Sequence, residues 1–229
     1  MSRLNRFRLI DDVCRVLEGA ILSGKMRPGE RLVVTQLADQ YNVSQSTIRE
    51  ALLMLDQRGL VVSKPRRGTF VTLLSEEEAL ELCQSRALLE AFAATTGADR
   101  VNADVLAAMN DCLIAMGNCS LPKDLPELIR LDLAFHRSII ELGDSTKLIE
   151  LWSSLNGQIG ALILRGVEQQ ELDIDDVVRL HRLVIDALAT GQPAVAQQAL
   201  VEHYIREEAD NIHHFTEIPQ VVSIVADRI

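Results

Sequence analysis

Two polar side chains interrupt an apolar helical stripe in the segment LIRLDLAFHRSIIEL, residues 128–142. Asp132 and His136 are four residues apart, so a helix places them side by side between Ile129 and Ile139. A buried carboxylate or imidazole needs a partner, because removing a polar group from water without compensation costs free energy. The stripe therefore predicts that other parts of the chain supply partners for this pair.

Two further histidines interrupt apolar stripes in the same way, each in a different predicted helix. His181 lies in a stripe that continues through Val184 and Leu188, and His203 follows Leu200 by three residues. One divalent ion would satisfy all four polar groups with three nitrogens and one oxygen. The proposed metal ligands are Asp132, His136, His181 and His203. Zinc is the best candidate by availability, with nickel, manganese and iron as alternatives, and an open coordination position could take a carboxylate.

Besides a metal site that takes a carboxylate, two other interpretations of this pattern are open. A single inward histidine is more often a satisfied core residue than a ligand, so the bundle could be a metal-free dimerisation module. An ion held by Asp and His could also activate water in a metal-dependent enzyme acting on a small carboxylate. No additional Glu, Ser or Cys stands out as a base or nucleophile near these segments, which argues against an enzyme. His213 and His214 are adjacent and are expected at the surface or in a dimer contact.

The charge distribution divides the 229-residue chain into two parts. Residues 1–74 have a net charge of +5 and residues 75–229 a net charge of −15, so the total of −10 hides a basic N-terminal domain. We expect domains at 1–74 and 75–229. The four cysteines form no CxxC pair, and no signal peptide or long apolar run is visible, which predicts reduced thiols, no membrane association and a cytoplasmic location.

Pattern and turn residues predict a mainly α protein with an N-terminal winged helix-turn-helix and a C-terminal all-α bundle. An amphipathic helix is expected over 7–23, and Thr35 and Ser44 are good N-caps for the two helices that follow. The segments LVVS and TFVT, joined by KPRRG, predict a β-hairpin with a basic tip. From Ser75 the period is helical throughout, with breaks near Gly97, at 120–126, near Gly143, through 169–176 and at 191–193.

The helix-turn-helix and the hairpin carry side chains suited to double-stranded DNA. A helix N-terminus binds phosphate, and Gln and Arg recognise base edges in the major groove. We expect Arg49 to make the strongest contact and Gln45 to tune sequence choice. The predicted DNA-binding residues are Thr35, Ser44, Gln45, Ser46, Thr47, Arg49, Arg66, Arg67 and Gly68. Single-stranded RNA is a weaker alternative, because aromatic residues make up only 3% of the chain.

The first third resembles the winged-helix domain of GntR-type bacterial transcription regulators. The resemblance runs over residues 20–71 through PGERL, VSxxTIREAL and RGxFV. It implies a homodimer that binds an operator of two-fold symmetry and regulates transcription, usually as a repressor. Many relatives carry Arg at the position of Gln45, so the family's operator sequence does not transfer directly.

Residues 76 to about 215 resemble the FCD ligand-binding domain of the FadR-type branch. The matching segments are RALLE at 86–90, DLAFH, LHRLVIDAL, the GQP break and the final helix with His203. The resemblance implies a divalent metal on the four proposed ligands and a small organic acid effector beside it. It also implies that Arg86, which lies on an apolar face, binds the effector carboxylate or orders the pocket.

Overall fold

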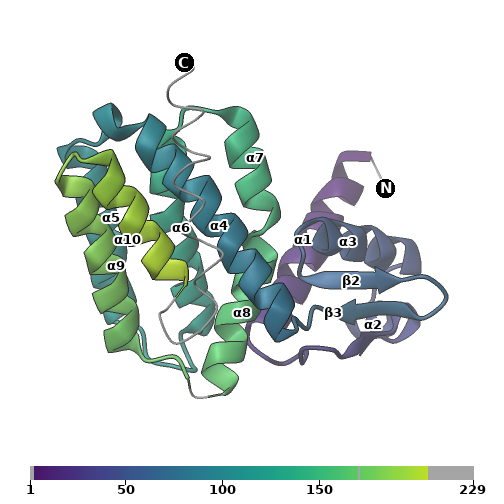
Figure 1. Cartoon of the computed structure of the whole chain (residues 1–229). Coiled ribbons are helices and arrows are strands. Elements are labelled where there is room, and N and C mark those ends of the chain that lie inside the picture. Colours follow the sequence, from purple (N-terminus) through teal and green to yellow (C-terminus); the bar gives the residue numbers. More distant parts are fainter. Residues whose placement is uncertain (1–2, 170, 206–229) are drawn as a thin grey trace.

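The computed structural model describes residues 3–169 and 171–205. His213 and His214 lie outside the described residues. Within them the chain is mostly helical, with one small sheet near the N-terminus (Figure 1). The predicted fold class, a winged helix followed by an all-helical bundle, is therefore confirmed. None of the described helices combines the length and the apolar character that a bilayer span requires.

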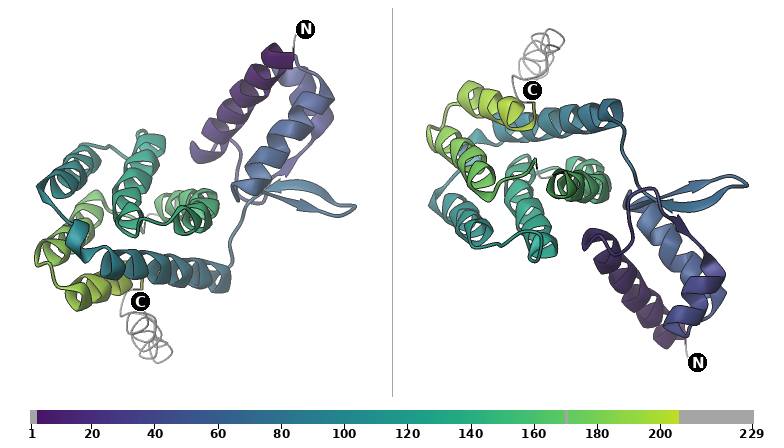
Figure 2. Two further views of the ribbon diagram at one scale, coloured as in Figure 1. Left: turned by 90° about the horizontal axis from the view of Figure 1, so that it is seen from above. Right: turned by 90° about the horizontal axis from the view of Figure 1, so that it is seen from below.

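The N-terminal part is a winged helix. Its elements are α1 (Arg3–Leu22), β1 (Arg31–Leu32), α2 (Val34–Tyr41), α3 (Gln45–Gln57), β2 (Val61–Lys64) and β3 (Gly68–Val71). The three strands are antiparallel in the order β1-β3-β2. The sequence predicted the hairpin of β2 and β3 but missed β1, because two residues are too short to show a period. Both views in Figure 2 show this hairpin projecting away from the rest of the molecule.

Helix capping explains where α2 and α3 begin. Ser44 is the N-cap of α3, as predicted, and its hydroxyl accepts a hydrogen bond from the Thr47 amide at 3.1 Å. The predicted cap at Thr35 is wrong, because the N-cap of α2 lies two residues earlier, at Val33, which makes no side-chain bond. Gly59 follows α3 with a φ of +73°, which suits glycine and ends the helix.

The C-terminal part is a helical bundle that begins with a capping box between Ser75 and Glu78. Its elements are α4 (Glu76–Thr96), η1 (Ala98–Arg100), α5 (Ala103–Gly117), α6 (Leu125–Leu142), α7 (Thr146–Ser154), α8 (Asn156–Glu168), α9 (Ile174–Ala189) and α10 (Pro193–Tyr204). The predicted breaks all occur, and one more at Leu155 separates α7 from α8. All four cysteines are unpaired, although only Cys14 is fully buried.

Separate apolar cores lie in the two parts. Leu17, Ile48 and Leu55 belong to the core of the winged helix, and Phe135 and Leu200 belong to that of the bundle. The polypeptide passes from one part to the other through the short segment 72–75, between β3 and α4. Helix α8 lies on the bundle side of this junction (Figure 1).

Backbone contact joins α8 to the C-terminal end of α3. A Cβ atom on Gly157 would overlap the carbonyl oxygen of Arg58, and one on Gly59 would stand 2.8 Å from Cγ of Gln158. Arg58 also pairs with Glu18 of α1 at 2.8 Å. The start of α8 therefore fixes the position of the winged helix against the bundle.

Gly157→Ala should destabilise the protein by about 1–3 kcal/mol, because the added methyl must push α8 away from Arg58. Chemical unfolding would measure this change. Gly19→Ala is the matched control, since Gly19 is also helical but has no atom within 4 Å of its Cβ position. We expect that variant to be neutral or slightly more stable. Equal stability of the two variants would contradict the assigned contact.

Candidate functional site

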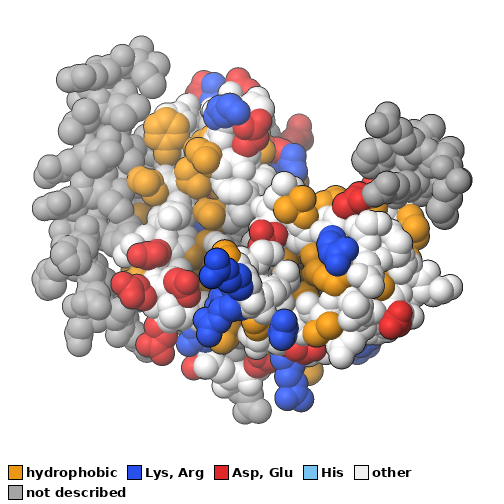
Figure 3. Space-filling view, turned by 90° about the vertical axis from the view of Figure 1, so that its right-hand side faces the viewer, with side chains coloured by type: hydrophobic (Ala, Val, Ile, Leu, Met, Phe, Trp, Pro, Cys, Tyr) orange, Lys and Arg blue, Asp and Glu red, His pale blue; other side chains and the backbone are white. Residues whose placement is uncertain are grey.

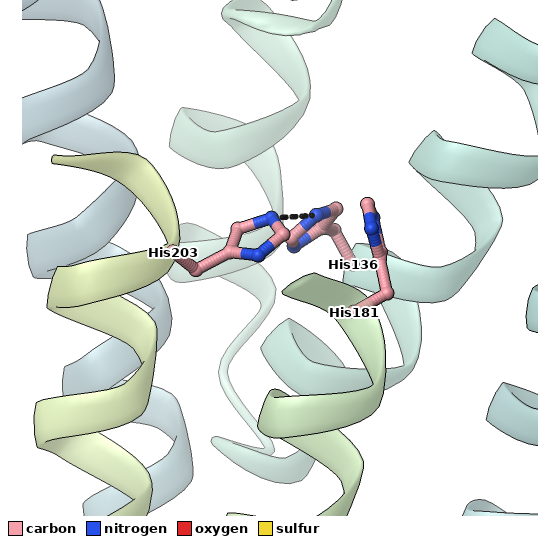
Figure 4. A group of neighbouring side chains, drawn as sticks. All are labelled: His136, His181 and His203. Atoms are coloured by element: carbon pink, nitrogen blue, oxygen red, sulfur yellow. Dashed lines mark hydrogen bonds between the residues drawn. The ribbon is translucent and has the colours of Figure 1, made fainter. Parts of the chain in front are cut away.

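Three histidines from three helices meet in the bundle. His136 of α6, His181 of α9 and His203 of α10 each offer a nitrogen, and these atoms lie within 4.8 Å of one another. Figure 4 shows the rings pointing toward a common centre, with Nε2 of His203 3.2 Å from Nε2 of His136. Asp132 lies beside them, with its Oδ1 3.2 Å from Nε2 of His181 and 3.9 Å from Nε2 of His136. The structure thus brings together all four residues that the sequence singled out.

Hydrogen bonds on the far side of two rings orient them. Nδ1 of His136 is 2.7 Å from Oε2 of Glu90, and Nδ1 of His181 is 2.8 Å from the carbonyl oxygen of Val177. Because these oxygens accept, both Nδ1 atoms donate, which leaves each Nε2 facing inward. Histidines that bind metals are typically oriented in this way.

The inward atoms fit a divalent cation. Nε2 of His181 is buried and has no hydrogen-bond partner among the described residues. Two nitrogens that each lie about 2.0 Å from a tetrahedral ion stand about 3.3 Å apart, close to the 3.2 Å between His136 and His203. Imidazole nitrogens with one carboxylate oxygen suit zinc and its neighbours in the first transition row. The donor set therefore has the chemistry of a metal centre.

The surroundings shift the pKa values of two of the proposed ligands, Asp132 and His203. Burial opposes ionisation of Asp132, but its contact with His181 and the charge of His136 outweigh burial and hold the pKa of Asp132 well below its usual value. Burial and the neighbouring His181 and His136 lower the pKa of His203 well below 6.5. At neutral pH Asp132 is therefore a carboxylate and His203 a neutral imidazole, which are the forms that bind metal.

The pKa of His136 is shifted in the opposite direction. Burial lowers it, but the charge and hydrogen bond of Glu90 outweigh burial and raise the pKa of His136 above 6.5. At pH values below its pKa, the metal-free His136 ring holds a proton that an ion must displace. Metal affinity should therefore fall about tenfold per pH unit as pH drops below the His136 pKa, while Asp132 stays ionised. A competition titration with a metal-binding dye between pH 5.5 and 8 would measure this, and affinity independent of pH would contradict it.

Sequence reasoning missed most of the polar network behind the donors. Glu90 is fully buried and accepts from Nε1 of Trp152 at 2.7 Å and from the hydroxyl of Tyr204 at 2.8 Å, in addition to His136. The only signal was that Glu90 shares the inward face of Arg86. Burial and the charge of Glu90 raise the pKa of Tyr204 well above 10, so its hydroxyl remains a donor.

Arg86 is also fully buried, but it does not line a cavity beside the donors. Its Nη1 donates to the carbonyl of Trp152 at 3.2 Å and to Oδ1 of Asn156 at 3.0 Å, and its guanidinium lies 4.0 Å above the Trp152 ring. Nε lies 3.7 Å from Glu90. The direct contact of Arg86 with an effector therefore stays a prediction, and the alternative role, ordering the site, fits these contacts.

A cavity of about 480 Å³ opens beside the donors. Asp132, His136, His203 and Tyr204 are among the polar residues that line it. Apolar side chains that include Ile159 and Leu172 line its walls, and Arg165 of α8 also faces it. A volume of this size suits a small organic molecule.

The winged helix exposes part of the predicted DNA-binding set. Gln45, Ser46 and Arg49 are exposed on the first turns of α3, and Nη2 of Arg49 donates to Oε1 of Gln45 at 3.3 Å. At the hairpin tip Arg66 and Arg67 are exposed, beside the exposed Gly68 with a φ of +108°. Figure 3 looks at the molecule from the wing side and shows several Lys and Arg side chains on this face.

Two residues of the predicted DNA-binding set, Thr35 and Thr47, differ from the others in their surroundings. Thr47 is only 4% exposed, because its hydroxyl turns back to the cap and lies 2.8 Å from Oγ of Ser44. Its side chain is therefore part of the cap, and its contact with DNA stays a prediction. Thr35 is exposed in the first turn of α2 and caps nothing, so only its exposure agrees with the prediction.

Comparisons with known proteins divide the chain in the same order. The family of bacterial regulatory proteins named gntR matches residues 9–71, and the FCD domain family matches residues 81–206. Together these matches include the winged helix and all four metal-ligand candidates.

Relatives match over most of the chain. A probable D-xylose utilization operon transcriptional repressor of Paenarthrobacter nicotinovorans is 26% identical, over 88% of each protein. A gluconate operon transcriptional repressor of Bacillus licheniformis is 26% identical, over 80% of this chain and 77% of the relative. Among solved structures, a putative transcriptional regulator GntR from Rhodococcus sp. RHA1 shares the fold with a TM-score of 0.70 and 22% identity, over 96% of this chain and 98% of that one.

Proposed function

Because the chain belongs to the GntR family of bacterial transcriptional regulators and carries an FCD domain, we propose that a small organic acid, held at a divalent metal site, controls its binding to operator DNA. The family and the relatives are transcriptional regulators and not enzymes, which decides against the metal-dependent enzyme. The observation that carries the proposal is the convergence of Asp132, His136, His181 and His203 beside a cavity.

The proposed ligands and the groups that orient them have different roles at the metal site. Asp132 supplies negative charge, and the three imidazoles supply neutral nitrogens. Glu90 and the Val177 carbonyl hold two rings in the required tautomer. When bound, a divalent ion such as zinc provides an electrophilic centre to which a carboxylate can bind. Nickel, manganese and iron are alternatives.

The effector class follows from the cavity and from the relatives. The cavity is lined by both polar and apolar side chains, which suits an organic acid with a short carbon skeleton. One relative is named for the gluconate operon, and gluconate is a small organic acid. Two relatives are named repressors, so we propose repression that the acid relieves.

A contiguous set of contacts can couple the site to the winged helix. His136 bonds Glu90, Glu90 faces Arg86, and Arg86 bonds Asn156 at the start of α8. The next residue, Gly157, packs on the carbonyl of Arg58 at the end of α3. A shift of α8 on effector binding would therefore move the recognition helix.

We propose that the protein acts in the cytoplasm as a homodimer on a two-fold symmetric operator. In such dimers a change in the relative position of the two recognition helices weakens binding, because half-site spacing is fixed by the DNA.

A thermal-shift screen of small carboxylates on metal-loaded protein tests the proposal. An acid that stabilises the wild type, leaves Asp132→Ala unchanged and releases operator DNA would support it. If the wild type bound no divalent ion and a chelator left its thermal stability unchanged, the metal-free dimerisation module would be the better description.

A further inference from the structure

We propose that Arg165 binds a carboxylate of the effector and that this binding changes its contact with the segment that joins the two parts of the chain, residues 72–75. This inference rests on the proposed function, because it assigns a residue to the cavity beside the metal donors. Arg165 lies on α8, on the bundle side of the junction, and lines the same cavity as Asp132 and His136.

Arg165 lines two cavities, as do its neighbours Glu76 and Gln169, and it is the cationic member of these three. One is the cavity beside the metal donors. The other lies at the junction and is lined by 72–75 together with residues of α4 and α8. The Arg165 side chain is 27% exposed, so part of it is accessible from these spaces. A group that enters the first cavity can therefore reach a side chain that also faces the junction.

The hydrogen bonds of Arg165 connect it to the joining segment. Its Nη1 donates to the carbonyl oxygen of Leu74 at 3.2 Å, and its Nε donates to Oε1 of Gln169 at 3.0 Å. Nη2 has a weaker contact, 3.8 Å from Oε1 of Glu76, whose side chain is 94% exposed. Such an exposed pair contributes little free energy, so Nη2 can exchange Glu76 for a better acceptor.

Charge singles out Arg165 as the anchor for an acid. Among the described residues that line the cavity, it is the only Lys or Arg. The carboxylates of Glu76, Asp132, Glu171 and Asp173 line the same cavity, and the metal ion would neutralise Asp132. A second anionic group of an effector therefore finds one cationic partner, the guanidinium of Arg165.

The apolar walls define the chemical class further. Ile159, Ile163 and Leu172 line the cavity together with the polar donors and Arg165. A small dicarboxylic acid can place one carboxylate on the ion, lay its carbon chain on these side chains and present the other carboxylate to Arg165. Small dicarboxylic acids are therefore the class of effector that this cavity suits, and they are the ligands to test.

Engagement of Arg165 by an acid has a consequence at the junction. The guanidinium is planar and presents its donors in a fixed fork, so a bidentate carboxylate that replaces Glu76 at Nη2 also takes Nη1. Nη1 then loses its bond to the Leu74 carbonyl. Leu74 lies between Thr72, which is bonded to Gly59 and Leu60 of the winged helix, and Ser75, which caps α4. Loss of the bond would loosen the connection between the two parts.

The test compares Arg165→Gln and Arg165→Lys with the control Arg137→Gln in the full-length, zinc-loaded protein. Arg137 is an exposed arginine of α6 that pairs with Glu141 at 2.7 Å, outside the cavity. Zinc stoichiometry and thermal unfolding establish that each variant is folded and loaded. Calorimetry with malonate, succinate, glutarate and adipate measures acid binding, and hydrogen exchange of residues 72–78 reports on the junction.

We expect at least one acid to bind wild type and Arg137→Gln equally and to speed exchange in 72–78. Arg165→Gln should keep zinc and lose at least about tenfold in acid affinity, with Arg165→Lys between them. Equal acid binding by Arg165→Gln, unchanged exchange in 72–78, or no binding of any of the four acids to zinc-loaded wild type would overturn this inference alone. Failure of the wild type to bind zinc would overturn the metal site and, with it, this inference.

Discussion

Replacement of Arg49 by alanine should weaken operator binding by about 100-fold or more without changing the fold. Arg49 is exposed on the second turn of α3, and its contact within the protein is the bond to Gln45. A well-placed arginine contributes about 1–3 kcal/mol of base discrimination, and a symmetric dimer loses this in both half-sites. An operator selected from random double-stranded DNA, followed by fluorescence anisotropy, would measure the loss.

The control for this prediction is Arg130→Ala, which removes an exposed arginine from α6 in the bundle. That variant should bind the operator with wild-type affinity. Gln45→Ala should change which bases are preferred more than it changes affinity for random DNA, because Gln45 stands beside Arg49. Wild-type operator affinity in a folded Arg49→Ala protein would remove Arg49 from the interface.

Replacement of His136 by alanine should lower zinc affinity by more than about 100-fold. The variant loses one nitrogen donor. It also loses the hydrogen bond of 2.7 Å between His136 and Glu90. Loss of an outer partner alone typically costs 10- to 100-fold, and loss of a ligand should cost more. The stabilisation of about 2.7 kcal/mol expected for wild type at zinc concentrations 100 times the Kd should disappear as well.

Two further variants should rank in zinc affinity relative to wild type and His136→Ala. Glu90→Gln keeps all four proposed ligands and weakens only the bond to His136, so its zinc affinity should fall between those of wild type and His136→Ala. Ser138→Ala, two residues away on α6, removes a hydroxyl that bonds the Ala134 carbonyl and should leave zinc binding unchanged. Equal zinc affinity in His136→Ala and Ser138→Ala would show that His136 is not a ligand.

The sequence predicted that four polar residues would meet, because each one interrupts an apolar stripe with helical period; their role as metal ligands stays a prediction. Asp132, His136, His181 and His203 could be recognised without knowledge of how α6, α9 and α10 pack, since burial alone demands a partner. Ser44 was predictable as a cap for a similar local reason. Both predictions depend on hydrophobic periodicity and on capping residues, which can be recognised from a few neighbouring positions in the sequence.

The remainder of the site depends on contacts between distant segments. Trp152 and Tyr204 reach Glu90 across 62 and 114 positions of the chain. Arg165 reaches Leu74 across 91 positions, and nothing near it in the sequence indicates that contact. The low exposure of Thr47 could not be predicted either, because the contact of its hydroxyl with Ser44 depends on a rotamer that the sequence does not specify.

The central claim, that the bundle of this regulator holds a divalent ion on Asp132, His136, His181 and His203, is tested most directly by elemental analysis. Wild type and His136→Ala would be purified without chelators or metal-affinity resin, dialysed, and examined by inductively coupled plasma mass spectrometry. We predict one divalent ion per chain in the wild type, zinc foremost, and loss of most of it in His136→Ala. Absence of a divalent ion from the wild type, even after incubation with zinc, would contradict the account.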